Sequence, residues 1–93
     1  MKNLDRYARG AVESFFELRQ FRKMAVTKRF VVEWLLIQSL IDQKNRAWAD
    51  LPDKVQKSVV GKELGRLRRN KKIEEVDANE IIHRDKIYRA VLR

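Results

Sequence analysis

The basic side chains between Lys54 and Lys72 are the part of the sequence best suited to chemistry. This run holds eight Lys or Arg residues and a single acidic residue, Glu63. Lysine and arginine neutralise the phosphates of nucleic acids, and arginine also pairs with base edges. A surface that is charged only for solubility usually mixes both signs. The run is therefore predicted to contact DNA or RNA.

A helix is expected to carry most of these charges. Val60, Leu64 and Leu67 lie at positions i, i+4 and i+7, the spacing of a buried helical stripe. Ser58 is a candidate residue to cap the start of this helix, and Asn70 is suited to end it in a left-handed conformation. The sequence thus predicts one basic helix over residues 58–70.

Polar side chains on the opposite face of this helix are predicted to point outward. With the apolar stripe inside, Ser58, Lys62, Arg66 and Arg69 lie on the outer side. Lys62 and Arg66 are the favoured contacts to bases, whereas the cations at the end of the helix suit phosphates. The candidate DNA-binding residues of this region are Lys57, Ser58, Lys62, Arg66, Arg68, Arg69, Lys71 and Lys72.

Two glycines interrupt the same helix one turn apart. Gly61 and Gly65 each cost a helix about 1 kcal/mol relative to alanine. Such a cost indicates that something benefits from close approach, either a DNA backbone or another helix.

Catalytic and metal-binding motifs are incomplete in this sequence. His83-Arg84-Asp85 matches the catalytic-loop triplet of protein kinases, but no glycine-rich phosphate loop accompanies it. Gly61-Lys62 lacks the upstream glycine and the following Ser or Thr of a phosphate-binding loop. The chain has one histidine and no cysteine, and neither a metal-ligand spacing nor a nucleophile paired with a base is present. We expect no enzyme activity, no metal and no cofactor.

The elements that must position the basic helix begin with an amphipathic helix near the N-terminus. Its apolar stripe has alternating spacings of four and three, and it continues through Phe21 toward Met24. Two uses of this stripe are open: packing within its own domain, or pairing with a second copy in a homodimer. The stripe consists of Leu4, Ala8, Ala11, Phe15 and Leu18.

A second helix is predicted after Thr27, which suits its N-cap. Phe30, Trp34, Ile37 and Ile41 lie on one face, and further apolar residues cover much of the remainder. A helix that is apolar nearly all round belongs at the centre of a domain. Trp34 and Trp48 are expected to be core anchors.

A short helix and a hairpin complete the predicted fold. Asp50 as N-cap with Pro52 in the first turn suits a short helix. After Asn70 the apolar period changes to that of strands, over residues 73–76 and 87–92. The predicted fold class is mainly α with a small β-hairpin.

This order of elements resembles the winged helix-turn-helix family, of which small phage and plasmid proteins are members. The resemblance covers residues 27–93, and residues 1–26 would form a preceding helix. Its most specific part is residues 60–67 running into Ile73. The resemblance implies that this helix lies in the DNA major groove while the hairpin, or wing, touches neighbouring phosphate or the minor groove.

Wing contacts implied by the resemblance are His83, Arg84 and Lys86. The sequence departs from the family pattern here, because Asp77, Glu80 and Asp85 surround these residues and repel phosphate. The Ile81-Ile82 pair is also more apolar than a solvated wing needs. An alternative is that the hairpin extends the sheet instead.

The leading hypothesis for function is sequence-specific binding of double-stranded DNA by a transcription or replication regulator. The net charge of +9 agrees with a phosphate polymer as partner. An adaptor that holds an acidic protein of the transcription or replication machinery is the alternative. RNA is a third possibility, but the aromatic platform of single-strand recognition is missing.

The expected location is the cytoplasm, that of the host if the protein is viral. The most apolar stretch, residues 30–41, is well short of the roughly 20 residues that span a bilayer. The absence of cysteine fits a reducing compartment.

Overall fold

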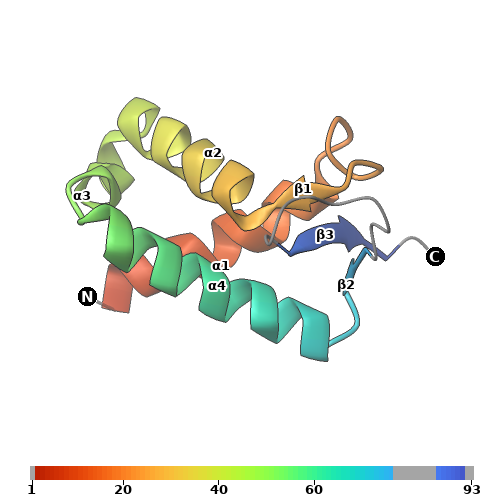
Figure 1. The fold of residues 1–93 in the computed structure, drawn as a ribbon. Coiled ribbons are helices and arrows are strands. Elements are labelled where there is room, and N and C mark those ends of the chain that lie inside the picture. Colours follow the sequence, from red (N-terminus) through yellow and green to blue (C-terminus); the bar gives the residue numbers. More distant parts are fainter. Residues whose placement is uncertain (1, 77–85, 92–93) are drawn as a thin grey trace.

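The computed structural model describes residues 2–76 and 86–91 and has the mainly helical α+β architecture that the sequence predicts (Figure 1). The helices are α1 (Lys2–Glu17), α2 (Lys28–Ile41), α3 (Arg46–Ala49) and α4 (Asp53–Arg69), with a 3-10 turn, η1, at Gln43–Asn45. The strands are β1 (Val26–Thr27), β2 (Ile73–Glu75) and β3 (Ile87–Ala90). None of the helices in these ranges combines the length and apolar character needed to cross a membrane.

The three long helices pack on one another, and the small sheet lies at one end of them (Figure 1). The sheet is antiparallel with strand order β1-β3-β2. Strand β1, which joins α1 to α2, pairs Val26 with Tyr88, and β2 pairs Ile73 with Ala90. The predicted hairpin is therefore present as β2 and β3, and the sequence analysis missed its third strand.

Helix α1 packs its apolar face inside the monomer. Ala8, Val12 and Phe15 are completely buried and Phe16 is nearly so, in the same core as residues of α2 and α4. Of the two uses predicted for the stripe, the structure shows packing within the chain. Ala8 and Phe15 have no exposed surface with which to contact a second copy, so two of the five residues predicted for the homodimer cannot take part in it.

The first helix is shorter than its apolar pattern predicted. It ends at Glu17, and a turn follows in which the carbonyl of Leu18 accepts hydrogen bonds from the amides of Phe21 (3.0 Å) and Arg22 (2.8 Å). This turn folds Phe21 back onto Phe15, with ring centroids 4.6 Å apart. The apolar pattern beyond Glu17 therefore does not continue the helix. It belongs to a turn that packs Phe21 on the core.

One polar bond ties α1 to α2. The hydroxyl of Tyr7 donates to the carbonyl oxygen of Leu35 at 2.9 Å. Burial, with a smaller contribution from the Asp42 carboxylate, raises the pKa of Tyr7 to about 12. The phenol therefore remains a neutral hydrogen-bond donor at physiological pH.

Thr27 caps α2 as predicted, since its hydroxyl oxygen accepts from the amide of Phe30 at 3.2 Å. The prediction that this helix lies at the centre of the domain holds for one side of it only. Val31, Leu35 and Ser39 face the core, whereas Phe30, Ile37 and Ile41 are exposed. Because both faces are apolar, hydropathy alone did not identify the inner one. Trp34 is half-buried, and Trp48 is fully buried as expected.

Helix α4 begins five residues before the predicted cap Ser58, which lies inside the helix. Asp50 closes α3 and does not start a helix. The early start depends on Gln56, a buried polar residue whose side-chain amide donates to the carbonyls of Trp48 and Leu51, both at 3.1 Å. Gln56 thereby extends the buried side of α4 by one turn toward its start. Because Gln56 is polar, the apolar pattern of the sequence did not predict this turn.

The end of α4 is a left-handed turn at Lys71, not at Asn70. Lys71 has φ 60°, whereas Asn70 has φ −84°. The amide of Lys72 donates to the carbonyl of Leu67 at 2.9 Å, which satisfies a carbonyl that the helix leaves open. This turn directs the chain from α4 into β2.

Replacing Lys71 with glycine should stabilise the protein. A left-handed backbone costs a non-glycine residue roughly 1–2 kcal/mol, of which part returns as glycine's larger loss of entropy on folding. We expect the free energy of unfolding of Lys71→Gly to rise by about 0.5–1 kcal/mol, as measured by urea denaturation. Asn70→Gly is the control and should be neutral or destabilising. A loss of stability in Lys71→Gly would contradict the left-handed turn.

Candidate nucleic-acid interface

The burial of one side of α4 determines which of its residues face outward. Gln56, Val60, Leu64 and Leu67 are all at least 96% buried, and they define the inner side. The opposite side carries residues that recur at the three- and four-residue spacings of one helix face. We call this side the α4 outer face; it consists of Lys54, Ser58, Gly61, Lys62, Gly65 and Arg69.

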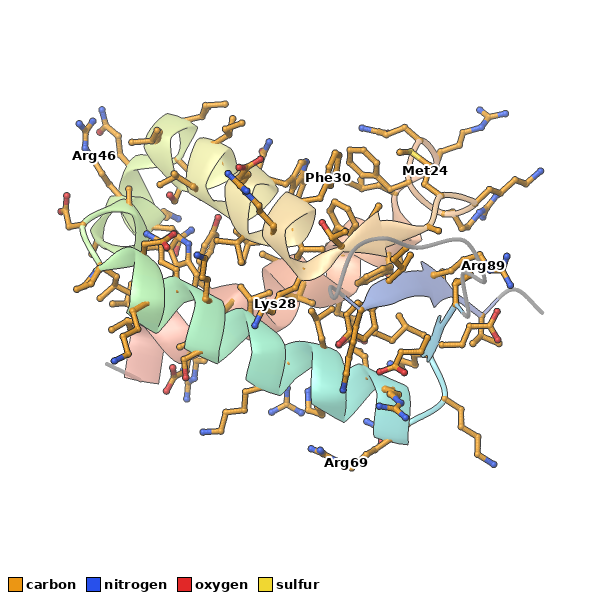
Figure 2. The ribbon with its side chains drawn as sticks, viewed as in Figure 1. Met24, Lys28, Phe30, Arg46, Arg69 and Arg89 are labelled. Atoms are coloured by element: carbon orange, nitrogen blue, oxygen red, sulfur yellow. The ribbon has the colours of Figure 1, made fainter. Side chains whose placement is uncertain are left out.

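The cations of the α4 outer face are available to a ligand. Lys54, Lys62 and Arg69 are exposed, and none of them forms an ion pair with another residue in the described ranges. Arg69 lies at the end of α4 (Figure 2), and its side chain runs back along the helix, so that a Cβ built on Gly65 would lie 3.5 Å from its Nη1. Lys71, exposed in the turn after α4, likewise has no ion-pair partner among the described residues. Of the predicted site residues, Ser58, Lys62, Arg69 and Lys71 are thus exposed and form no ion pair with a described residue.

Lys28 is a further cation beside this face, and the sequence analysis missed it. A Cβ atom built on Gly61 would lie 3.6 Å from Cδ and 3.7 Å from Nζ of Lys28, so the ammonium group lies next to α4 (Figure 2). Lys28 is the first residue of α2, directly after the cap Thr27. The amides at a helix start favour anions. The sequence did offer one indication of this site, because Lys28 directly follows the predicted N-cap Thr27.

Arg66 does not project freely as predicted. Its Nε donates to Glu63 at 2.9 Å and its Nη2 donates to Glu13 of α1 at 3.3 Å, and only 21% of its side chain is exposed. These contacts, of which the hydrogen bond to Glu63 is the strongest, raise the pKa of Arg66 further above its ordinary value. Arg66 therefore holds α4 against α1, and the prediction that it contacts bases is not supported by its position.

Glu13 is the acceptor that joins these elements. It also accepts a hydrogen bond from Nζ of Lys72 at 2.7 Å. The bonds from Lys72 and then Arg66 lower the pKa of Glu13. One carboxylate thus uses two of the cations that the sequence analysis assigned to DNA.

Other predicted contacts are also paired within the chain. Arg68 (3.1 Å) and Lys86 (3.5 Å) both lie beside the carboxylate of Glu75, while Lys57 pairs with Asp53 at 2.9 Å. These pairs are exposed and weak, so a phosphate can compete for each cation. Arg84 and His83, with the acidic and apolar residues predicted around them in the hairpin tip, lie outside the described residues.

The described residues contain no group of three or more His, Asp or Glu side chains arranged to hold a metal ion. A cavity of about 360 Å³ lies where the ends of α1 and α4 meet the sheet, and it is lined in part by Glu13, Glu17, Arg22 and Lys72. Glu13 and Lys72 already pair with each other across it.

Glu13 should make the stability of the protein depend on acidic pH. Because the pKa of Glu13 is lowered in the folded state, its contribution is present above its ordinary pKa of 4.5 and is lost as the pH falls through the lower folded value. We expect Glu13→Gln to be less stable than the wild type at pH 7, with the difference shrinking toward pH 3. Thermal unfolding from pH 3 to pH 7 measures this.

The matched control is Glu17→Gln, which removes an exposed carboxylate of the same helix that has no ion pair with a described residue. It should follow the wild-type pH profile. A difference between Glu13→Gln and the wild type that stays constant with pH would contradict the proposed role of the Glu13 carboxylate.

Comparisons with protein-family models, with curated proteins and with solved structures found no match to this chain.

Proposed function

We propose that this protein binds double-stranded DNA in a sequence-specific manner, with the α4 outer face in the major groove. One observation supports this proposal more than any other: the face combines cations that no described residue pairs with and two glycines that the fold itself does not need. A major groove about 12 Å wide admits an α-helix. Lys62 and Ser58, near the middle of the face, would contact base edges, and Lys28, Arg69 and Lys71 at its borders would contact phosphates.

The glycines distinguish this surface from an ordinary solvated helix. A Cβ at Gly61 or Gly65 would meet only side-chain atoms, the nearest at 3.6 Å and 3.5 Å, which are ordinary contact distances. Alanine therefore fits both positions within the monomer and would favour the helix by about 1 kcal/mol each. Glycine at both sites is explained if a DNA backbone or base edge approaches α4 closely.

The order of the elements supports a winged-helix arrangement as part of the same proposal. Helices α2 and α4 would be the two helices of the DNA-binding motif, joined through α3, and β2 and β3 would form the wing. In the described part of the hairpin, Glu74 pairs with Arg89 at 2.6 Å, and Glu75 pairs with Arg68 and Lys86. These pairs neutralise carboxylates that would otherwise repel phosphate. A DNA-binding domain of this kind suits a regulator of transcription or replication.

Replacing Gly65 with alanine should separate stability from binding. We expect Gly65→Ala to raise the free energy of unfolding by about 1 kcal/mol, because helix propensity improves and the methyl group has room. DNA affinity should fall at the same time, because the methyl group occupies the space needed by the DNA. Urea denaturation and fluorescence anisotropy with a labelled duplex measure the two quantities.

Gly10→Ala is the matched control, since apart from neighbouring residues and the backbone of α1 nothing lies within 4 Å of the added Cβ, and Gly10 is in α1, away from the α4 outer face. It should be stabilised similarly and bind DNA like the wild type. An unchanged DNA affinity of Gly65→Ala would contradict a close approach of DNA at this glycine.

Salt dependence tests the electrostatic part of the proposal. With Lys28, Arg69 and Lys71 on phosphates, log K should fall against log salt with a slope of about −3. Arg69→Ala should weaken binding to all sequences and reduce the size of the slope by about 1. Arg46→Ala, an exposed arginine at the α3 end of the molecule, far from Arg69 in Figure 2, should change neither quantity.

A salt-independent affinity, or equal effects of Arg69→Ala and Arg46→Ala, would contradict the proposal.

The Lys62→Ala variant distinguishes DNA binding from the alternative, an adaptor that holds an acidic protein. In a DNA reader it should reduce sequence preference by about 1–3 kcal/mol at the contacted base pair. An adaptor would show no sequence preference in either form.

A further inference from the structure

The outer side of α2 carries an apolar patch that is separate from the α4 outer face. Five large apolar side chains are exposed there: Met24 (42%), Phe30 (39%), Ile37 (55%), Leu40 (50%) and Ile41 (72%). Four of them lie on α2, and Met24 lies in the turn just before β1. We call these residues the α2 outer patch. Exposed apolar residues gathered in this way mark interaction sites.

We propose that the α2 outer patch is the contact between two copies of this chain, with their α2 helices packed antiparallel. This dimer uses a different surface from the α1 stripe, which is occupied inside the monomer. The proposal does not depend on DNA binding.

The spacing of the outer stripe of α2 favours a second copy as the occupant. Phe30, Trp34, Ile37 and Ile41 are separated by four, three and four residues, a pattern that reads the same in both directions. In an antiparallel pair, Phe30 of one copy faces Ile41 of the other, and Trp34 faces Ile37. Every layer of the contact is then apolar on both sides, as a two-fold interface requires.

Two residues of the outer stripe of α2 also pack against the core. The ring of Trp34 packs edge-to-face on Phe15, with centroids 5.3 Å apart, and Phe30 lies 5.9 Å from the same ring. Their exposed parts therefore lose little side-chain entropy when a second copy binds.

Charge also favours this face for self-association. The chain has a net charge of +9, so two copies repel each other over most orientations. The α2 outer patch contains no charged residue, and Arg29 and Glu33 beside it form an ion pair with each other at 3.3 Å. Two copies that meet here avoid a like-charge contact that would oppose association elsewhere.

The geometry is compatible with a free α4 outer face. Phe30 and Met24 project from one side of the molecule, whereas Arg69 projects from the opposite side (Figure 2). A dimer through α2 therefore leaves the α4 cations of both copies exposed.

The dimer should be weak, because the contact is small. Helix α2 has 14 residues, and a helix of that length is about 21 Å long. Its outer face buries less than the roughly 800 Å² per partner of a standard interface. We expect a dissociation constant on the order of 10–100 µM.

Sedimentation equilibrium of the full chain from about 1 µM to about 1 mM, the range that brackets this affinity, tests the proposal. The wild type should change from monomer to dimer, and Ile37→Glu should weaken association at least tenfold while keeping the wild-type circular dichroism spectrum and melting temperature. Val91→Glu is the matched control, since Val91 is another exposed apolar residue (37%) that lies outside the patch; it should associate like the wild type. A wild type that stays monomeric, or a dimer unaffected by Ile37→Glu, would overturn the proposal.

The antiparallel register can be tested separately because the chain has no cysteine. The double variant Phe30→Cys/Ile41→Cys should form a covalent dimer on mild oxidation. Within one chain the two positions are about 16 Å apart along the helix, too far for an internal disulfide. Ile41→Cys alone should not cross-link, because its two thiols lie at opposite ends of the interface. Cross-linking of this single variant as readily as the double one would show a parallel arrangement and contradict the proposal.

Discussion

Val60, Leu64 and Leu67 hold α4 in one rotational setting, because all three are almost completely buried against the packed helices α1 and α2. This packing turns Lys62 and Arg69 to solvent and directs Arg66 toward α1. The chemistry of the outer side is therefore a consequence of the apolar inner side. A rotation of α4 by one residue, about 100°, would bury cations and expose the core stripe, and the cost of an unpaired buried charge prevents it.

The basic run serves two purposes in the folded chain. Arg66 and Lys72 converge on Glu13, and Arg68 meets Glu75, so these cations join α4 to α1 and to the sheet. Lys57 pairs with Asp53 within α4, whereas Lys54, Lys62, Arg69 and Lys71 have no ion-pair partner among the described residues. A dense block of positive charge in a sequence therefore overstates the number of groups offered to a ligand. The ion pairs of Arg66, Arg68 and Lys72 also help to hold α4 in position, and they thereby determine where its other cations lie.

Local features of the fold were predictable from sequence, whereas features that depend on distant residues were not. Thr27 caps α2 as expected, and the inner stripe of α4 follows its helical spacing. Strand β1 was missed because two residues become a strand only by pairing with β3, some 60 positions later. The pairing of Arg66 depends on Glu13, also distant in the chain, and the inner face of α2 depends on the packing of α1. In the candidate site, sequence reasoning found Lys62 and Arg69 but missed Lys28, which reaches α4 only in the folded structure.

The central claim is that the α4 outer face, and not another part of this basic surface, contacts DNA. The most direct measurement is the change in backbone amide chemical shifts, followed by NMR, when a duplex enriched by selection from random sequences is added to the ¹⁵N-labelled protein. We expect the largest changes at Ser58, Lys62, Gly65 and Arg69, with smaller ones at Lys28 and Lys71. Changes confined to the α2 outer patch or to the start of α1, with α4 unaffected, would contradict it.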